Sequence, residues 1–183
     1  MSEIRVDNIT NEAGTGKPGF PNGITATGAA LTDPEITGGI YLGGTGSANY
    51  LEDYEEGTWN PEWNVDVVYR NQGGTYVKVG KTVFAYFDLQ TDDSPSTSTD
   101  RIQIINLPFT PSDVGTSRSA SGFAKSFGNN WDSGNQPQWF FPSATSPTAV
   151  AKYESNGQEA FLPSSALSRT TRISGTLIYG TDS

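Results

Sequence analysis

Hydrophobic residues follow two different patterns along this chain of 183 residues. In residues 1–50 they stand singly among glycine and threonine, and no helical spacing of i, i+3, i+4 and i+7 connects them. Such a segment cannot bury enough apolar surface by itself to offset the entropy lost on ordering. Three copies wound around a common axis would bury it, because each apolar residue would meet its counterparts. The pattern therefore predicts either an ordered trimeric stalk or a flexible linker.

The isolated apolar residues of this predicted stalk, residues 1–50, form the predicted assembly and attachment site. They are Ile4, Val6, Ile9, Phe20, Ile24, Leu31, Ile36, Ile40 and Leu42. An acidic junction follows at residues 51–61, where Leu51–Gly57 carries four carboxylates. The sequence places no apolar pocket around these carboxylates, so they indicate a solvated surface rather than an acid–base pair.

Residues 62–183 show the alternation that is typical of β-strands. In the segment 82–90, four apolar residues share one face of the expected strand. They are Val83, Ala85, Phe87 and Leu89. The opposite face carries Phe84 and Tyr86, so we expect that face to be covered as well, by a neighbouring subunit or by the stalk.

Turn signals divide this region into short antiparallel strands. Gly80-Lys81 separates the runs 76–79 and 82–90 and predicts a hairpin with a II′-like turn. Asn156-Gly157 separates 149–155 from 158–162 and predicts a two-residue type I′ hairpin. Further strands are expected at 101–107, 120–127, 138–141 and 171–179, and no helical pattern occurs. The predicted fold is all-β, an extended N-terminal stalk and an antiparallel, jelly-roll-like β-sandwich head at residues 62–183, assembled as a homotrimer.

Composition narrows the possible partners. The chain has 20 acidic and 11 basic residues, a formal charge of −9, and 34% hydrophobic residues. Scattered basic residues in an acidic chain argue against nucleic acid as a partner. The polar N-terminus is unlike a signal peptide, and no apolar run approaches the ~20 residues of a membrane span. The chain contains no cysteine, so its durability is expected to come from oligomerisation rather than from disulfides.

The residue types that most enzymes need are missing. The chain has no histidine and no cysteine, which excludes Ser-His and Cys-His catalysis and makes a zinc site implausible. A glycosidase needs only two carboxylates, and nothing in the sequence singles out a pair among the candidates. These candidates are Asp66, Asp88, Asp92, Asp93, Asp132 and Glu154. We therefore expect no enzymatic activity, no cofactor and no metal.

A polar loop around one tryptophan is the predicted receptor-binding site. It comprises Asn129, Asn130, Trp131, Asp132 and Gln136. An aromatic ring flanked by amides suits carbohydrate, since a sugar has an apolar face and a polar edge. The second nearby tryptophan, Trp139, stands beside Phe140 and Phe141 and is interpreted as a core residue instead.

Several motifs resemble structural proteins of bacteriophages, in particular cyanophage-like tail-fibre and virion proteins. The N-terminal motifs are Ile4–Ile9, Gly19–Ile24, Gly39–Gly46 and Leu51–Pro61, and the later ones are Gly74–Val83, Asn106–Phe109 and Ile173–Leu177. The resemblance spans most of the chain, with Leu51–Pro61 as its most specific motif, whereas Ser112–Leu167 diverges. The stalk is also short for a phage fibre.

The resemblance implies a non-enzymatic virion protein made in the host cytoplasm. Its leading form is a homotrimeric short tail fibre or receptor-binding protein, attached through its N-terminus and presenting the head to the host. The implied partners are further copies of the chain, other virion proteins of the tail or capsid, and host surface polysaccharide. A trimeric knob that cements the capsid remains an alternative because the stalk is short, and a polysaccharide-degrading tailspike is a third.

Overall fold

The computed structural model divides the chain into two units, Met1–Thr37 and Gly38–Ser183. It describes Ala13, Ile36 and residues 38–92, 101–112, 121–127, 138–140, 149–155 and 158–182. For those of its described residues that lie between 121 and 160, only the backbone is described, except that the side chain of Ala149 is described as well. All the elements described below belong to the second unit.

The described part of this unit consists of strands joined by turns, with two short 3₁₀ helices and no α-helix. In chain order the elements are β1 (Ile40–Tyr41), η1 (Ser47–Asn49), β2 (Tyr50–Leu51), β3 (Tyr54–Trp59), β4 (Glu62–Trp63), β5 (Tyr69–Val79), β6 (Thr82–Thr91), β7 (Gln103–Ile105), β8 (Ser121–Phe127), β9 (Gln138–Phe140), β10 (Ala149–Ser155), β11 (Gln158–Phe161), η2 (Ser164–Ala166) and β12 (Arg172–Gly180). The all-β prediction is confirmed. No helix in the described residues is long and apolar enough to cross a membrane.

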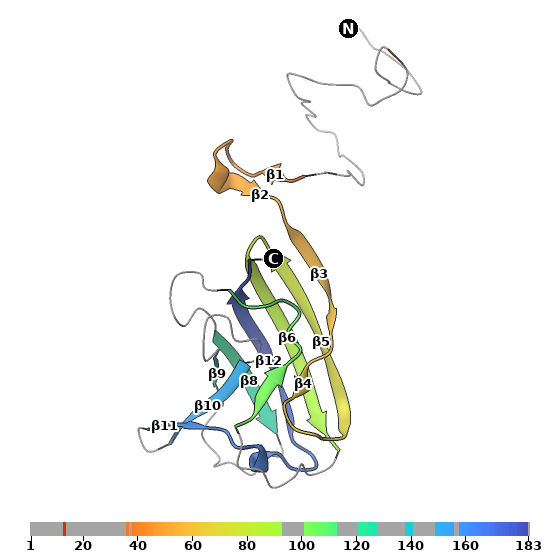
Figure 1. Ribbon diagram of the computed structural model, residues 1–183, viewed down its shortest axis with the longest axis vertical. Coiled ribbons are helices and arrows are strands. Elements are labelled where there is room, and N and C mark those ends of the chain that lie inside the picture. The colour runs from red at the N-terminus through yellow and green to blue at the C-terminus, as the bar shows by residue number, and fades with distance from the viewer. Residues whose placement is uncertain are drawn as a thin grey trace. The chain divides into compact units, whose positions relative to one another are not determined.

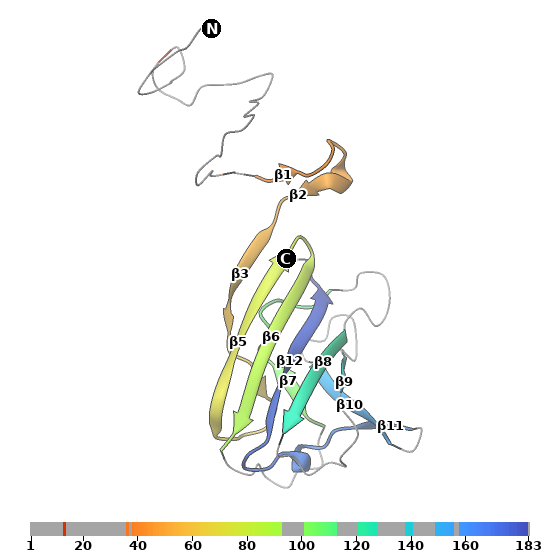
Figure 2. The same cartoon turned by 180° about the vertical axis from the view of Figure 1, so that it is seen from behind.

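The strands form a two-stranded ribbon, β1–β2, and one ten-stranded sheet in which every pairing is antiparallel. The order in the sheet is β3-β5-β6-β12-β8-β9-β10-β7-β4, and β11 pairs with β10. The sheet folds over on itself, so that β7 overlaps β12 when seen from either side, whereas β10 and β11 lie beyond β8 on the side away from β6 (Figures 1 and 2). This gives the two layers of a sandwich.

The core fills the space between these layers. The alternation predicted for residues 82–90 is confirmed, because Val83, Ala85, Phe87 and Leu89 of β6 are fully buried. Strand β12 adds Ile173, Leu177 and Tyr179, and the opposite layer adds Trp63, Ile102, Ile104 and Ala149. Each large apolar side chain buried in this way contributes about 1.5–3 kcal/mol to folding.

Two hairpins follow the predicted turn signals. Val79 pairs directly with Thr82, so Gly80 and Lys81 form a two-residue loop. Gly80 has a φ of +55° while Lys81 does not have a positive φ, which is the pattern of a II′ turn and confirms that prediction. Strands β10 and β11 pair up to Ser155 and Gln158, as the second hairpin requires, although Asn156-Gly157 itself lies outside the described residues.

The acidic segment predicted as a junction contains a strand of the sheet. Strand β3 pairs with β5 along its whole length, from Tyr54 opposite Val79 to Trp59 opposite Gly74. This pairing is possible because β5 is eleven residues long and its second edge would otherwise be open. The acidic residues are therefore held by an edge strand rather than by a free connecting segment.

Candidate interaction surface

A buried lysine fixes the start of β3 to the sheet. Lys78 of β5 is only 2% exposed, and its ammonium group forms an ion pair with the carboxylate of Asp53. The same ammonium group lies 5.2 Å from the centre of the Phe109 ring. The backbone N–H of Gly80 donates to the carbonyl of Asp53 at 2.7 Å. An ammonium group out of water needs such partners, so Asp53 and Phe109 allow Lys78 to be buried.

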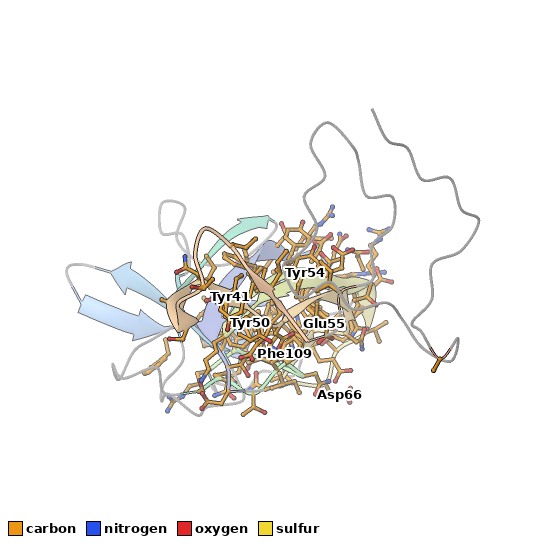
Figure 3. The ribbon with its side chains drawn as sticks, turned by 90° about the horizontal axis from the view of Figure 1, so that it is seen from above. Tyr41, Tyr50, Tyr54, Glu55, Asp66 and Phe109 are labelled. Atoms are coloured by element: carbon orange, nitrogen blue, oxygen red, sulfur yellow. The ribbon has the colours of Figure 1, made fainter. Side chains whose placement is uncertain are left out.

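A tyrosine extends this contact along β3. The hydroxyl of Tyr76 donates to Glu55 at 2.5 Å, and the Tyr76 ring meets Phe109 edge to face at 5.2 Å. The hydrogen bond to the Glu55 carboxylate raises the pKa of Tyr76 above its ordinary value. Figure 3 shows the side chains from above and labels Glu55 and Phe109. The carboxylates of Asp53 and Glu55 in the acidic segment thus bind two groups of β5, the Lys78 ammonium and the Tyr76 hydroxyl.

A tryptophan ties the other end of β3 to β6. The indole N–H of Trp59 donates to the backbone carbonyl of Tyr86 at 2.8 Å, across the intervening strand β5. The ring passes over Gly74, where a Cβ would lie 2.2 Å from the indole nitrogen and 2.5 Å from the Tyr86 oxygen. Glycine at position 74 is therefore required for this crossing.

The ribbon carries apolar side chains that the described chain leaves exposed. Tyr41 and Tyr50 lie opposite each other, with ring centres 4.8 Å apart (Figure 3). Its loop is closed by two hydrogen bonds between Leu42 and Asn49, of 2.8 and 2.9 Å. The exposed apolar residues of the ribbon and its loop are Ile40, Tyr41, Leu42 and Tyr50, at 39% to 55% exposure, and Ile36 of the first unit is 56% exposed. No charged residue occurs from position 36 to 51.

A second exposed surface is the side of the sheet that faces away from the core, here called the outer face. It is formed by Tyr54, Glu56 and Thr58 of β3, Gly73, Thr75, Val77 and Val79 of β5, Thr82, Phe84, Tyr86 and Asp88 of β6, and Arg172, Ser174, Thr176, Ile178 and Gly180 of β12. Phe84 and Tyr86 are exposed, so the described chain does not itself supply the expected cover for this face.

The charged groups of the outer face are already paired. Arg172 donates to both carboxylate oxygens of Asp88, at 2.8 and 2.5 Å, and Asn71 donates to Asp88 at 2.7 Å. The carboxylate beside Arg172 raises the pKa of its guanidinium. At the other end, the hydroxyl of Tyr54 donates to Glu56 at 3.0 Å, which raises the pKa of that tyrosine.

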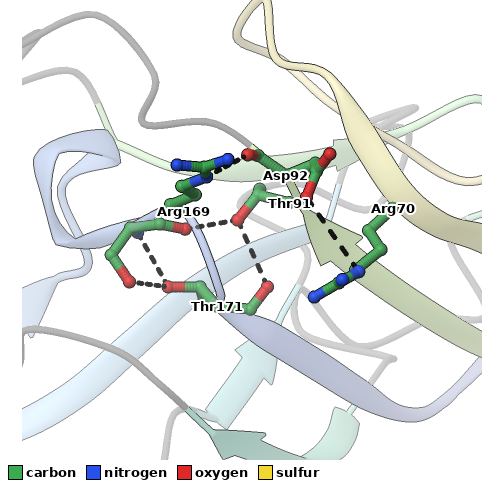
Figure 4. Close-up of polar contacts among 6 residues, drawn as sticks. Arg70, Thr91, Asp92, Arg169 and Thr171 are labelled. Carbon is green, nitrogen blue, oxygen red and sulfur yellow. Dashed lines mark hydrogen bonds and ion pairs between the residues drawn. The ribbon is translucent and has the colours of Figure 1, made fainter.

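A polar cluster closes the sheet where β6 ends and β12 begins (Figure 4). Thr91 donates its backbone N–H to the carbonyl of Thr171 at 3.0 Å and its hydroxyl to the carbonyl of Ser168. Arg169 donates to the carbonyl of Asp92 at 3.1 Å, and the Asp92 carboxylate lies 4.0 Å from Arg70. These contacts anchor the turn before β12, so the cluster has a structural role.

Three of the carboxylates considered for glycoside hydrolysis have described side chains: Asp66, which is exposed, Asp88 and Asp92. Asp88 is held by Arg172 and Asn71, and Asp92 lies near Arg70. Asp93, Asp132 and the side chain of Glu154 are outside the description. Among the described residues, no group of three or more carboxylates is arranged to hold a metal ion.

The structure describes part of the predicted site residues. Ile36, Ile40 and Leu42 of the predicted assembly site are described, and all three are exposed. The others lie outside the described residues. They are Ile4, Val6, Ile9, Phe20, Ile24 and Leu31 of the assembly site, and Asn129, Asn130, Trp131, Asp132 and Gln136 of the predicted receptor loop. The roles of both sets stay predictions.

Sequence reasoning missed several exposed residues beside those it named. The sequence did contain a signal for Tyr41 and Tyr50 of the ribbon, because they stand in the same charge-free segment as Ile40 and Leu42. Ile178 also had one, since it alternates with Leu177 and Tyr179 and must face away from them. The ion pair of Lys78 with Asp53 had none, because it depends on how β3 pairs with β5.

Comparison with known proteins supports the fold. The sequence matches no protein-family model and no curated protein. Among solved structures, the chain is similar to the crystal structure of Dettilon tailspike protein (gp208), with a TM-score of 0.58 and 14% sequence identity. The match covers 69% of this chain and 24% of the length of that protein. At this identity the likeness establishes that the two proteins share a β fold over the matched region.

Proposed function

We propose that this chain is a structural protein of a bacteriophage tail. The observation that carries the proposal is the shared fold with a tailspike protein over 69% of the chain. The resemblance of Leu51–Pro61 to the junctions of phage fibre proteins supports it independently, because that resemblance rests on sequence and not on fold. The proposed location of the protein is accordingly the virion.

The form that suits the chain best is a short, non-enzymatic tail fibre or receptor-binding protein, assembled as a homotrimer. The N-terminal segment provides the attachment, and its described end is charge-free and exposes five large apolar side chains. The head provides the surface for the host, where the 129–136 loop is the proposed contact with surface polysaccharide. The pairing of Asp88 with Arg172 is consistent with a binding role rather than hydrolysis.

Labelling the virus particle tests this proposal. An antibody raised against the full chain, detected with gold by electron microscopy, is expected to mark the tail of intact particles. A particle lacking the gene product serves as the control for antibody specificity. Label confined to the capsid faces, or the absence of the chain from purified particles, would contradict the proposal.

A further inference from the structure

The outer face of the sheet carries a continuous apolar patch across four strands. The register places Phe84 of β6 directly between Val77 of β5 and Ile178 of β12. In the adjacent row Tyr86 lies between Thr75 and Thr176. Side chains opposite each other on antiparallel strands are about 4.5–5.5 Å apart at Cβ, so these residues form one surface.

The exposure of this patch exceeds what an isolated head needs. Its five large members, Tyr54, Val79, Phe84, Tyr86 and Ile178, are between 39% and 61% exposed. Single exposed apolar residues are ordinary, but contiguous patches rimmed by polar residues mark interaction sites. Here the rim is threonine and serine, together with the Asp88–Arg172 pair and Glu56, which accepts a hydrogen bond from Tyr54.

The patch carries little net charge. The whole chain carries −9, yet the outer face has only two carboxylates, and one of them is neutralised by Arg172. A second acidic chain meets little repulsion at such a surface. A basic partner would gain little here.

The charged groups on this face are already hydrogen-bonded, which favours a protein surface over a sugar as the occupant. Carbohydrate binding needs donors and acceptors that are free to bond hydroxyl groups beside an aromatic ring. Asp88 already accepts from Arg172 and Asn71, and Glu56 accepts from Tyr54. The aliphatic side chains of Val79 and Ile178 fit an apolar protein surface instead.

A second copy of the chain also supplies apolar surface that could cover the patch, since every copy exposes the charge-free ribbon as well as the outer face. We propose that the outer face of β3-β5-β6-β12, centred on Phe84 and Ile178, is the surface through which one copy of this chain binds a second copy. This inference rests on the assembly proposed above and assigns the contact to one face of the head.

Light scattering and thiol labelling of the purified full chain test the proposal. The wild type is expected to have a mass that is a multiple of 19.6 kDa at micromolar concentration. Because the chain has no cysteine, a Thr75→Cys variant carries a single thiol on the outer face. Maleimide should modify this thiol at least about tenfold more slowly than the thiol of Thr170→Cys, which lies exposed in the turn before β12.

Substitutions on the outer face provide a second test of the proposal. The double variant Phe84→Thr/Ile178→Thr keeps residues that favour strands and is expected to dissociate at least about tenfold more readily. The matched control Val68→Thr/Phe161→Thr removes two apolar residues of similar exposure outside the outer face and should assemble like the wild type. Circular dichroism shows whether each variant retains its β structure.

Three results would overturn the proposal. A folded Phe84→Thr/Ile178→Thr variant that assembles like the wild type would place the contact elsewhere. A monomeric wild type with a freely labelled thiol at position 75 would leave the face to another protein or to a glycan. A monomeric wild type in which that thiol is protected would show that the chain's own N-terminal segment covers it. None of these results bears on where the chain lies in the virion, which the gold labelling decides.

Discussion

At the scale of single residues, Lys78 shows how the head accommodates a charge in its interior. Its ammonium group is removed from water and depends on the carboxylate of Asp53 and the ring of Phe109. Removing one partner of such a pair leaves an uncompensated charge, whereas replacing the charge by an apolar group of similar length does not.

The two ends of this pair should therefore respond differently to mutation. Asp53→Ala is expected to lower the free energy of unfolding by about 1–3 kcal/mol, because the buried ammonium loses its counter-charge. Lys78→Met should cost less than Asp53→Ala, since methionine fills the same space without a charge. Urea unfolding at pH 7 measures both. A greater loss for Lys78→Met would refute this account of the pair.

Tyr179 predicts a response to alkaline pH. Burial raises the pKa of its hydroxyl well above the ordinary value of 10.0. The unfolded chain therefore loses this proton near pH 10 while the folded chain keeps it, so the stabilising contribution is complete below pH 10 and is lost as pH rises above it.

The matched test is Tyr179→Phe. The substitution removes the hydroxyl that accepts a hydrogen bond from the Phe109 N–H, at a cost of about 1 kcal/mol near neutral pH. Between pH 10 and 12 the wild type should lose stability more steeply than the variant, by up to about 1.4 kcal/mol per pH unit. Parallel slopes in urea unfolding would show that Tyr179 does not titrate on unfolding.

At the scale of elements, the edge strand β3 is held by contacts that reach across β5. The Trp59 indole passes over Gly74 to reach the carbonyl of Tyr86, and Lys78 and Tyr76 bind the carboxylates at the other end of β3. The contact of β3 with β6 therefore depends on Gly74 of the intervening strand β5.

Two adjacent glycines of β5 provide a matched pair for this point. Gly74→Ala is expected to cost about 2–3 kcal/mol, because the new Cβ would clash with Trp59 and with backbone. Gly73→Ala should be neutral or slightly stabilising, since no atom lies within 4 Å of the added Cβ. Thermal unfolding of both variants measures the difference. Equal losses would mean that Trp59 does not require glycine at position 74.

Local patterns in the sequence predicted the strands of the head better than their partners. The alternation of Val83 to Leu89 and the turn at Gly80 were sufficient for the hairpin β5–β6, because period and turn chemistry are local properties. The pairing of β3 with β5 and the order of the ten strands depend on contacts between distant segments, which periodicity does not encode. The receptor loop cannot be compared, as it lies outside the described residues.

At the scale of the whole molecule, the charge-free segment 36–51 and the outer face of the sheet both expose large apolar side chains. Both features favour assembly, and the proposed location of the assembled chain is the phage tail. Host contact is assigned to the 129–136 loop by sequence reasoning.

Competition with phage adsorption tests that loop. Purified full chain is expected to inhibit adsorption of the phage to its host, and Trp131→Ala should weaken the inhibition about tenfold through loss of ring stacking. Thr170→Ala, a change in the exposed turn before β12, is the control and should inhibit like the wild type. Undiminished inhibition by Trp131→Ala would remove this loop from the host contact.

An electron cryomicroscopy reconstruction of the intact phage tests the proposed tail location and the proposed contact between copies together. We expect density for this head on the tail, in several copies, with the Phe84 and Ile178 face of each copy packed against its neighbour. Density for the head on the capsid shell, or single heads on the tail whose outer faces are open to solvent, would contradict it.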